Sequence, residues 1–397
     1  MSAVPKLRFP EFDGRWEHSK IGKFLSWHKQ KTKVENEFPV MSSSRAGLVL
    51  QSEYYGENRI TLRSNIGFNV IPPNYVTFRN RSDDRKFFFN TNRTGTSGAI
   101  SQFYPVFDVV NADKDFLVLL LNLKQHELGI LSVGTSQTVL SNTELTNVKF
   151  AFPSLPEQQK IASFLSSVDK KIGLLHQKKD ALELYKKGLM QKIFSQEIRF
   201  KQDDGSDFSA WEEVALGDVL HEHKEKSAGQ EPVFSVSVSK GLVDQIEHLG
   251  RSFSAADTGH YNKAKPHDVI YTKSPTGNFP LGIIKQSTVG FDVIVSPLYG
   301  VFTPETPALG FILNAYFESE INAGNYLSPL VQKGAKNTIA CTNKRFLEGG
   351  LLLPRSHDEQ RKIADFLAVI QKKIAVTSSQ IEQMETFKKG LLQQMFV

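Results

Sequence analysis

The residues that could carry chemistry are of two kinds: fragments of catalytic motifs, and clusters of basic and amide side chains. The stretch Ile71-Pro72-Pro73-Asn74-Tyr75 has the composition of the Asn-Pro-Pro-Tyr element of adenine methyltransferases. That element needs its amide before the two prolines, where this chain has isoleucine. The order instead predicts an extended turn entering a strand, because a residue before proline avoids the helical region.

A second fragment, His221-Glu222-His223, offers metal-binding side chains without a second ligand pair at suitable spacing. We interpret it as the solvated end of a helix. Glu222 and Lys224 resemble part of a nuclease carboxylate–lysine pattern, but the partner acid is missing. The chain also has no glycine-rich nucleotide loop. The sequence therefore predicts no catalytic residue, no metal site and no cofactor of its own.

Basic and amide side chains suited to DNA gather in two windows, each with a local charge of +3. Residues 77–93 hold five Lys or Arg against two Asp, and residues 260–285 hold four Lys against one Asp. Arginine and lysine can bond guanine, and asparagine can bond adenine, in the major groove. Other basic residues would neutralise phosphates and set the register. The candidates are Arg79, Asn80, Arg81, Arg85, Asn90, Asn92 and Arg93, then Lys263, Lys273, Ser274, Thr276 and Asn278.

For any single one of these residues, a solvated loop rich in turn formers explains the composition equally well. The recurrence of the window after the same predicted strand is what favours DNA contact. A further basic strip is interpreted in the same way, although its counterpart in the first half lacks the charge. It consists of Lys333, Lys336, Asn337, Lys344 and Arg345.

The element that must position these windows is a long helix over residues 153–194. Ser154 and Glu157 fit a capping box, and Pro156 falls in the first turn, where proline is tolerated. A seven-residue pattern follows, with eight of ten positions apolar, which indicates a coiled-coil seam in need of a partner helix. Its main apolar positions are Ile161, Leu165, Val168, Ile172, Leu182 and Leu189.

The partner helix is in the same chain, because residues 354–396 repeat this stretch at a constant offset of 202 residues. Ser356 and Glu359 rebuild the capping box, and the seam is again apolar at eight of ten positions. Agreement over some forty residues without a gap indicates an internal duplication. The second set of seam positions includes Ile363, Leu367, Ile370, Ile374, Ile381 and Leu391.

The duplication extends into the segments before the helices. Leu7-Arg8-Phe9 followed by Trp16 matches Ile198-Arg199-Phe200 followed by Trp211, and later landmarks recur in the same order. A helix is predicted in each half, around 113–126 and 308–322. On the long helices, Gly188 and Gly390 each cost about 1 kcal/mol of helix propensity. We interpret these two glycines as sites of close helix approach or of a bend.

Composition sets wider limits. With 397 residues, 40% of them apolar, the chain is long enough for two or three domains. One cysteine excludes a disulfide framework and fits a reducing cytoplasm. The N-terminus lacks the apolar core of a signal peptide, and the longest apolar run is too short for a membrane span. The net charge of +6 favours a polyanionic partner.

At this point the sequence resembles the specificity subunit of a Type I restriction–modification system. The resemblance is carried by LPEQQKIASFLSSVDKKI with YKKGLMQKIF, and by DEQRKIADFLAVIQKKI with FKKGLLQQMF. The KLRF…W opening and the VIVSPLYGVF stretch add to it. The resemblance implies an α+β fold: two mixed α/β target-recognition domains joined by two long antiparallel coiled-coil helices, with an internal pseudo-two-fold repeat.

The resemblance also implies a division of the chain and a set of partners. The first target-recognition domain would be 1–152, the first spacer helix 153–196, the second domain 197–352 and the second helix 353–397. Each domain would read half of an asymmetric double-stranded DNA site. Two modification subunits would carry S-adenosylmethionine, and two restriction subunits would add ATP- and Mg-dependent translocation and cleavage. Two rival interpretations are a self-contained DNA-modifying enzyme and a coiled-coil adaptor that does not bind DNA.

Overall fold

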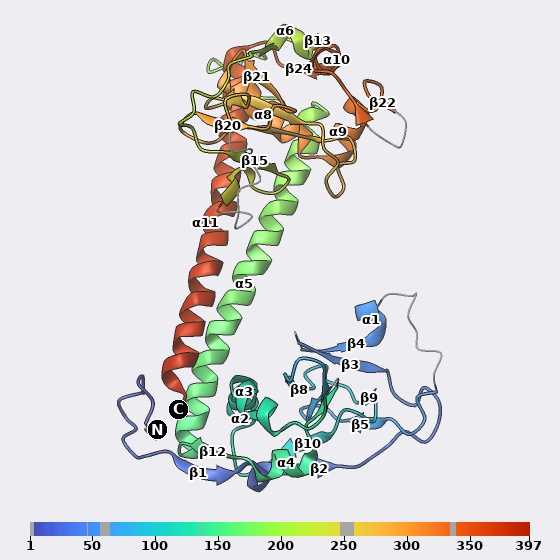
Figure 1. Cartoon of the computed structure of the whole chain (residues 1–397), viewed down its shortest axis with the longest axis vertical. Helices are drawn as coiled ribbons and strands as arrows, with labels where there is room; N and C mark the ends of the chain where they lie inside the picture. The colour runs from blue at the N-terminus through green and yellow to red at the C-terminus, as the bar shows by residue number, and fades with distance from the viewer. Residues whose placement is uncertain (1–3, 46, 56–63, 136, 247–257, 334–338) are drawn as a thin grey trace. The chain divides into compact units, whose positions relative to one another are not determined.

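A computed structural model describes residues 4–45, 47–135, 137–246, 258–333 and 339–397, except 56–63 (Figure 1). The chain divides into two compact units. Unit 1 comprises Met1–His176 with Ser379–Val397, and unit 2 comprises Gln177–Ser378. Each unit therefore contains one mixed α/β domain, part of the first long helix and part of the second.

Unit 1 is built on a four-stranded sheet of order β2-β10-β6-β8, in which all pairs are antiparallel. Helices α2 and α3 follow the last strand of that sheet in the chain. The elements up to the first long helix are β1 Glu17–Lys20, η1 Ile21–Phe24, β2 Leu25–His28, β3 Met41–Ser44, β4 Gly47–Leu50, α1 Gln51–Tyr55, β5 Asn69–Ile71, β6 Val76–Phe78, β7 Arg81–Ser82, β8 Phe89–Thr91, β9 Gly98–Ile100, β10 Val106–Val109, α2 Lys114–Leu123, α3 Gln125–Leu131, β11 Thr138–Val139, α4 Asn142–Asn147 and β12 Lys149–Phe152.

Unit 2 repeats this topology, with a sheet of order β14-β21-β18-β19. The first and last strands of each domain also pair, β1 with β12 and β13 with β24. The elements are β13 Glu212–Ala215, α6 Leu216–Val219, β14 Leu220–Glu222, β15 Phe234–Ser237, β16 Gly241–Asp244, β17 Asn262–Ala264, β18 Val269–Thr272, β19 Ile283–Gln286, β20 Val293–Val295, β21 Gly300–Pro304, α8 Pro307–Phe317, α9 Glu320–Leu327, β22 Gln332–Lys333, β23 Ile339–Ala340, α10 Asn343–Leu347 and β24 Gly350–Leu353.

The long helices are α5 Leu155–Phe194 and α11 His357–Met395. In unit 1 the first turns of α5, with Ile161 and Leu165, pack in one apolar cluster with Leu391 and Met395 of α11. In unit 2, Leu189 of α5 packs with Ile370 and Ile374 of α11. The start of one helix thus meets the end of the other within each unit, so the pair is antiparallel. The predicted seam residues are buried, except Ile172 and Leu182, which are half-buried.

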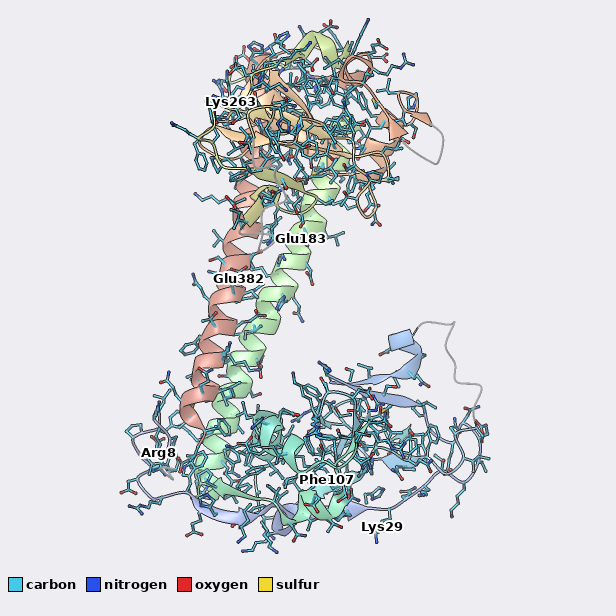
Figure 2. All side chains as sticks on the ribbon, in the orientation of Figure 1. Arg8, Lys29, Phe107, Glu183, Lys263 and Glu382 are labelled. Carbon is cyan, nitrogen blue, oxygen red and sulfur yellow. The ribbon has the colours of Figure 1, made fainter. Side chains whose placement is uncertain are left out.

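Aromatic side chains dominate the cores of both domains. Phe107 on β10 and Phe302 on β21 are fully buried at matching positions, and Figure 2 shows Phe107 within unit 1. Phe78 stacks on Phe89 with ring centroids 4.6 Å apart. In unit 2, Tyr271 stacks on Phe346 at 4.7 Å. These rings anchor the ends of the central strands β6 and β18, after which the candidate DNA residues begin.

The structure corrects the glutamate half of the predicted capping boxes, whereas the Ser356 hydroxyl does accept from Glu359 N at 3.4 Å. The Glu157 carboxylate is 1% exposed and receives two hydrogen bonds of 2.7 Å from the Arg8 guanidinium and one of 3.3 Å from Trp16 Nε1. In unit 2, Arg199 bonds the equally buried Glu359 at 2.9 and 3.3 Å. These glutamates tie the start of each domain to its long helix, so they do not reach back to a helix-terminal N–H.

Three smaller predictions also change. Each predicted helix of the domains is two helices, α2 with α3 and α8 with α9. In unit 2 the Ser319 hydroxyl caps the start of α9 by accepting from Asn322 N. A Cβ built on Gly188 or Gly390 would meet nothing within 4 Å, so close helix approach does not explain these glycines. Residues 220–222 form strand β14 and not a helix end, since β14 pairs with β21 in the central sheet.

Candidate nucleic-acid interface

The first candidate window begins where β6 ends. Arg79 is exposed, and Asn80 is half-buried with its backbone fixed on both sides. The Asn80 N–H donates to Phe103 O at 3.0 Å, and its C=O accepts from Leu140 N at 2.9 Å. The Arg81 guanidinium lies over the Phe103 ring, 3.9 Å from its centroid. This loop therefore presents three polar side chains on a rigid backbone.

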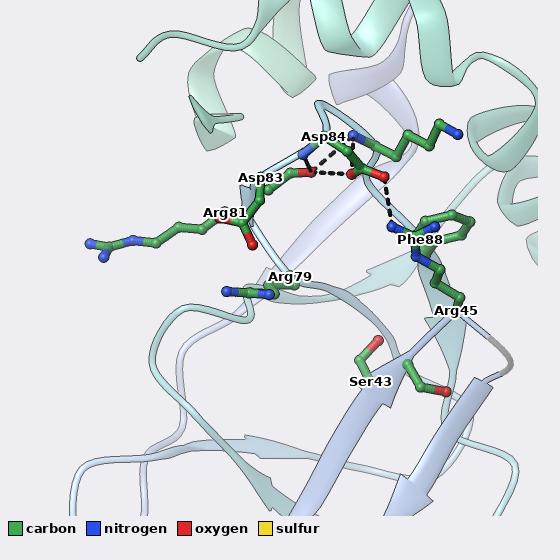
Figure 3. Close-up of a pocket in the computed structure, with 10 residues that line it drawn as sticks. Ser43, Arg45, Arg79, Arg81, Asp83, Asp84 and Phe88 are labelled. Carbon is green, nitrogen blue, oxygen red and sulfur yellow. Dashed lines mark hydrogen bonds and ion pairs between the residues drawn. The ribbon is translucent and has the colours of Figure 1, made fainter. Parts of the chain in front are cut away.

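Two of these side chains, Arg79 and Arg81, line a hollow of about 520 Å³ (Figure 3). Figure 3 shows Arg45, from the tip of the β3–β4 hairpin, meeting Asp84 at 2.6 Å. Four cations and two carboxylates face this hollow. Its lining is Ser43, Ser44, Arg45, Arg79, Arg81, Ser82, Asp83, Asp84, Lys86 and Phe88.

The prediction had missed Arg45 as a site residue. It lies more than thirty positions before the window, in a Ser-Ser-Ser-Arg stretch that resembles an ordinary turn. The pairing of β3 with β4 is what turns it toward Asp84. The Ser82 hydroxyl, followed by Arg45, lowers the pKa of the Asp84 carboxyl below its usual range. Asp84 therefore stays charged and holds Arg45 through an exposed ion pair, a kind that contributes little stability.

Other candidates in this window have structural partners. Asn92 is fully buried; its Nδ2 donates to the carbonyls of Ile71, Pro72 and Thr96, and its Oδ1 accepts from Thr94. Asn90 Nδ2 donates to the β3 end, at 2.7 Å to Ser43 Oγ and 2.8 Å to Ser44 O.

Two arginines of the window remain at the surface. Arg93 is exposed and ion-paired with Asp115, and exposed pairs of this kind exchange readily with solvent. Arg85 is exposed with a left-handed backbone of φ 59°. We keep both as candidates, because neither side chain is buried in the fold of unit 1.

The candidates in the window of unit 2 also divide into side chains with structural partners and side chains at the surface. Lys263 is 19% exposed and ion-paired with Glu231 at 3.0 Å and Asp292 at 3.6 Å. Its hydrogen bond lowers the pKa of the Glu231 carboxyl to about 2. Ser274 and Thr276 are exposed, and exposed Asn278 donates to Glu320 Oε1 at 2.8 Å. Lys273 is half-buried, and burial lowers its pKa.

The basic strip is only partly described. Lys336 and Asn337 lie outside the described residues. Lys344 and Arg345 are exposed on the short helix α10, whose start is capped by the Thr342 hydroxyl. Arg345 pairs with Glu348 one turn later at 2.7 Å. This surface is therefore basic, and its only described acidic contact is solvent-exposed.

Three comparisons relate the chain and its fold to known proteins. The family model for the Type I restriction modification DNA specificity domain matches residues 15–184. The MjaVIII type I restriction enzyme specificity subunit of Methanocaldococcus jannaschii is 23% identical over 97% of this chain and 92% of its own length. The match to a DNA specificity domain thus covers the domain of unit 1 and most of α5, and the match to the MjaVIII subunit extends over both units.

A second relative is the MjaX specificity subunit of the same organism, 26% identical over 70% of this chain. The chain spans 65% of that relative's length. Among solved structures, a Type I S subunit from M. genitalium covers 99% of both chains at 14% identity with a TM-score of 0.60. A second solved structure comes from work on complex assembly and conformational transition of the type I R-M system. It has a TM-score of 0.51 at 15% identity and covers 96% of this chain and 97% of its own. These likenesses confirm the predicted fold class.

No group of three or more metal-binding side chains occurs among the described residues. The half-buried His223 makes a hydrogen bond of 2.8 Å to the buried Asp268 carboxylate, which also accepts from Thr303 and Lys265 N. These hydrogen bonds connect the strands β14, β18 and β21 of unit 2. Within the described ranges, no helix is both long and apolar enough to cross a bilayer.

Proposed function

We propose that each unit of this specificity subunit binds one half of a bipartite, asymmetric double-stranded DNA site. The observation that carries the proposal is the combination of one shared topology with unlike polar surfaces at matching positions. The same strand exit presents Arg79, Asn80 and Arg81 in unit 1, but Lys273 and Ser274 in unit 2, where the residue that matches Arg79 is the buried Thr272. Two domains that share one topology but offer different polar side chains would recognise two different half-sites.

The proposed contact surface is smaller than the composition suggested. In unit 1 it comprises Arg45, Arg79, Asn80, Arg81 and Lys86, with Arg85 and Arg93 as phosphate contacts. Asn90 and Asn92 are left out, because their amides hold strands together. In unit 2 it comprises Lys273, Ser274, Thr276, Asn278, Lys344 and Arg345. Lys263 is left out because two carboxylates already hold it.

The finer composition of the complex is also a proposal. Two modification subunits would supply S-adenosylmethionine and adenine methylation. Two restriction subunits would supply ATP- and Mg-dependent translocation and cleavage. The complex would act in the cytoplasm, with the DNA. The four-part division at 152, 196 and 352 stays our proposal for where the target-recognition domains end and the spacer helices begin.

The long helices carry a surface suited to the modification subunits. His176 and Glu385, which form an ion pair of 3.6 Å, occupy flanking seam positions on one side of the helix pair. The opposite flank has exposed apolar residues at equivalent places in the two repeats. Leu174 (56% exposed) matches Val376 (50%), and Tyr185 (56%) matches Phe387 (51%).

By the helix register, Leu174 and Phe387 form a patch in unit 1, and Tyr185 and Val376 form one in unit 2. Exposed apolar groups at helical spacing fit an amphipathic helix of a partner. Two such patches, generated by duplication, would receive two copies of the same partner. This supports one modification subunit on each unit.

The test is co-expression of the full chain with its modification subunit in a host that lacks adenine methylation, followed by mapping of N6-methyladenine. We expect one bipartite motif with an unread spacer. Expression of the chain alone with S-adenosylmethionine should give no methylation. DNA binding by the complex should weaken steeply as salt rises, because phosphate contacts release counterions. A complex that methylates without any sequence preference, or does not bind DNA, would contradict the proposal.

A further inference from the structure

Strand register makes Asn80 and Lys273 the same position in the two units. Val76 of β6 is opposite Phe107, and Val269 of β18 is opposite Phe302. Counting four residues from each valine leads to Asn80 and Lys273. Both follow the central strand of their sheet, directly after the aromatic rings that anchor it. The two side chains differ in chemistry, one a neutral amide and the other an amine, although the strands around them have the same topology.

In unit 1 the hydrogen-bonding groups of the Asn80 side chain are unused. Its Oδ1 is shielded from solvent and accepts no hydrogen bond from any described residue. Buried polar atoms nearly always have a partner, and an exception in a folded protein calls for an explanation such as an absent ligand. The backbone bonds to Phe103 and Leu140 hold the residue in place. Asn80 therefore has a fixed backbone and an amide with spare donor and acceptor capacity, and its shielded Oδ1 meets a ligand only after the side chain rotates outward.

The neighbouring amides show why this matters. Asn90 and Asn92 belong to the same window, and both spend their amides on backbone and hydroxyl partners within unit 1. Asn80 lies between Arg79 and Arg81, which line the positively charged hollow of unit 1 (Figure 3). Asn80 itself does not line the hollow, but it is the one amide of this window whose groups the described fold does not use.

Lys273 is the corresponding side chain of unit 2. It is half-buried, and burial lowers its pKa because the charged form loses hydration. The described residues give it no hydrogen bond or ion pair, whereas Lys263 and Lys265 are each held by a carboxylate. An ammonium that is partly desolvated without a partner gains from a negatively polarised ligand.

We propose that Asn80 and Lys273 are the base-discriminating residues of the two units, Asn80 reading an adenine and Lys273 reading a guanine in the major groove. An asparagine amide accepts from adenine N6 and donates to N7, and a lysine ammonium donates to guanine O6 and N7. Arg79 and Lys86, which are exposed, set the register on phosphates. This inference rests on the proposed DNA-reading function and assigns its specificity to one equivalent position per unit.

The experiment exchanges the two side chains in the full chain. Asn80→Lys and Lys273→Asn are each co-expressed with the modification subunit, and the methylated motif is mapped. We expect Asn80→Lys to convert one adenine of a single half-site to guanine, leaving the other half-site unchanged. Lys273→Asn should do the reverse in the other half-site. The matched control is Asn325→Lys, an exposed amide of α9 outside the proposed contact surface, which should leave the motif unchanged.

Alanine variants cover the case in which an exchanged side chain does not fit. Asn80→Ala and Lys273→Ala should relax one base position each, lowering discrimination there by roughly 5- to 150-fold. Motifs that stay as strict as wild type in both alanine variants would overturn the inference, as would a base change in the wrong half-site. Failure of the proposed function is distinguishable, because then the wild-type complex itself would show no bipartite motif.

Discussion

At the scale of single residues, burial decides which charges are structural. The Arg8–Glu157 pair has side chains 13% and 1% exposed, and its two hydrogen bonds connect residues 149 positions apart. By contrast, the Arg361–Asp358 pair is 69% and 67% exposed and spans one turn of α11. A buried pair cannot exchange a lost partner for water, whereas an exposed pair can.

This contrast gives a stability prediction. Glu157→Gln removes the negative charge and leaves the Arg8 guanidinium without an ionic partner, which should destabilise unit 1 by about 3 kcal/mol. Asp358→Asn is the matched control and should cost under about 1 kcal/mol. Urea unfolding followed by tryptophan fluorescence measures both, since Trp16 donates to Glu157 in unit 1 and the buried Trp211 lies in unit 2 with Asp358. Equal midpoints for the two variants would show that Glu157 is not a structural anion.

Glu231 gives a prediction about acid stability. Its hydrogen bond from Lys263 lowers the pKa of the carboxyl from 4.5 to about 2 in the folded unit. A carboxyl whose folded pKa is depressed adds stability above its unfolded pKa, and that stability is lost as pH falls. The unfolding midpoint of the wild-type chain should therefore decline between about pH 4.5 and 2. Glu231→Gln should start lower at pH 6 and decline less over this interval; parallel curves would contradict the assignment.

The residue scale also shows where sequence reasoning stops. Glu157 had the spacing of a capping box, but its partner Arg8 is far away along the chain, so no local pattern reveals it. Asn92 resembled Asn80 in composition. Only the closing of β5, β8 and the following turn around Asn92 distinguishes the structural amide from the unused one. The seam residues were predictable, because a seven-residue repeat fixes burial locally.

At the scale of elements, the long helices were predicted closely, and so were the short strands β6 and β18 that lead into the two windows, but other short strands were not. α5 begins two residues after the predicted start and ends at the predicted Phe194. Strands of two to four residues such as β7, β14 and β17 carry too little periodicity to be read alone. His221-Glu222-His223 was therefore misread as a helix end. Its pairing with β21, eighty residues later, fixes it as a strand.

The outer face of the helices carries the next prediction. Tyr185→Glu and Phe387→Glu each put a charge in one proposed docking patch, so the affinity of the full chain for the modification subunit should fall at least tenfold per patch. Figure 2 locates this part of the helix pair by two other exposed residues, Glu183 on α5 and Glu382 on α11. Titration of the purified subunits by calorimetry measures affinity and stoichiometry together.

The matched control is Leu184→Glu, because Leu184 is 72% exposed but lies at the heptad position directed away from the seam. It should bind like the wild-type chain. A single-patch variant should bind one modification subunit tightly and the other weakly. If Leu184→Glu weakens binding as much as Tyr185→Glu does, the docking surface is not the flank defined by the two patches.

At the scale of the whole molecule, the duplication could be predicted from the sequence. Which residues are structural and which are free to contact DNA could not be predicted. A 202-residue offset without a gap implies two like halves, and the repeated sheet topology agrees with it. The sequence could not show which window residues face solvent, because each sheet is closed by strands from distant parts of the chain. β10, for example, lies between β6 and β2, and β2 comes some eighty residues earlier in the chain. The set of residues able to contact DNA therefore depends on tertiary structure, although the repeated architecture itself could be predicted from the sequence.

The last prediction concerns the helices as a spacer between the two readers. Insertion of seven helical residues after Gln177 and seven more at the equivalent position after Ser379 keeps both seams in phase. Each insertion adds about 10.5 Å at 1.5 Å per residue. At 3.4 Å per base pair, the unread spacer of the methylated motif should lengthen by up to about three base pairs, with both half-sites unchanged. Methylome sequencing of the co-expressed complex measures this directly.

An insertion in α5 alone is the control, because it leaves the two helices unequal in length and their seams out of step. That variant should lose methylation, or lose stability, without gaining a new spacer. A doubly inserted chain that is folded and active on the original spacer would show that the helices do not set the distance between half-sites. The half-sites would then be positioned by the partner subunits, and the duplicated helices of this chain would serve only to join the two units.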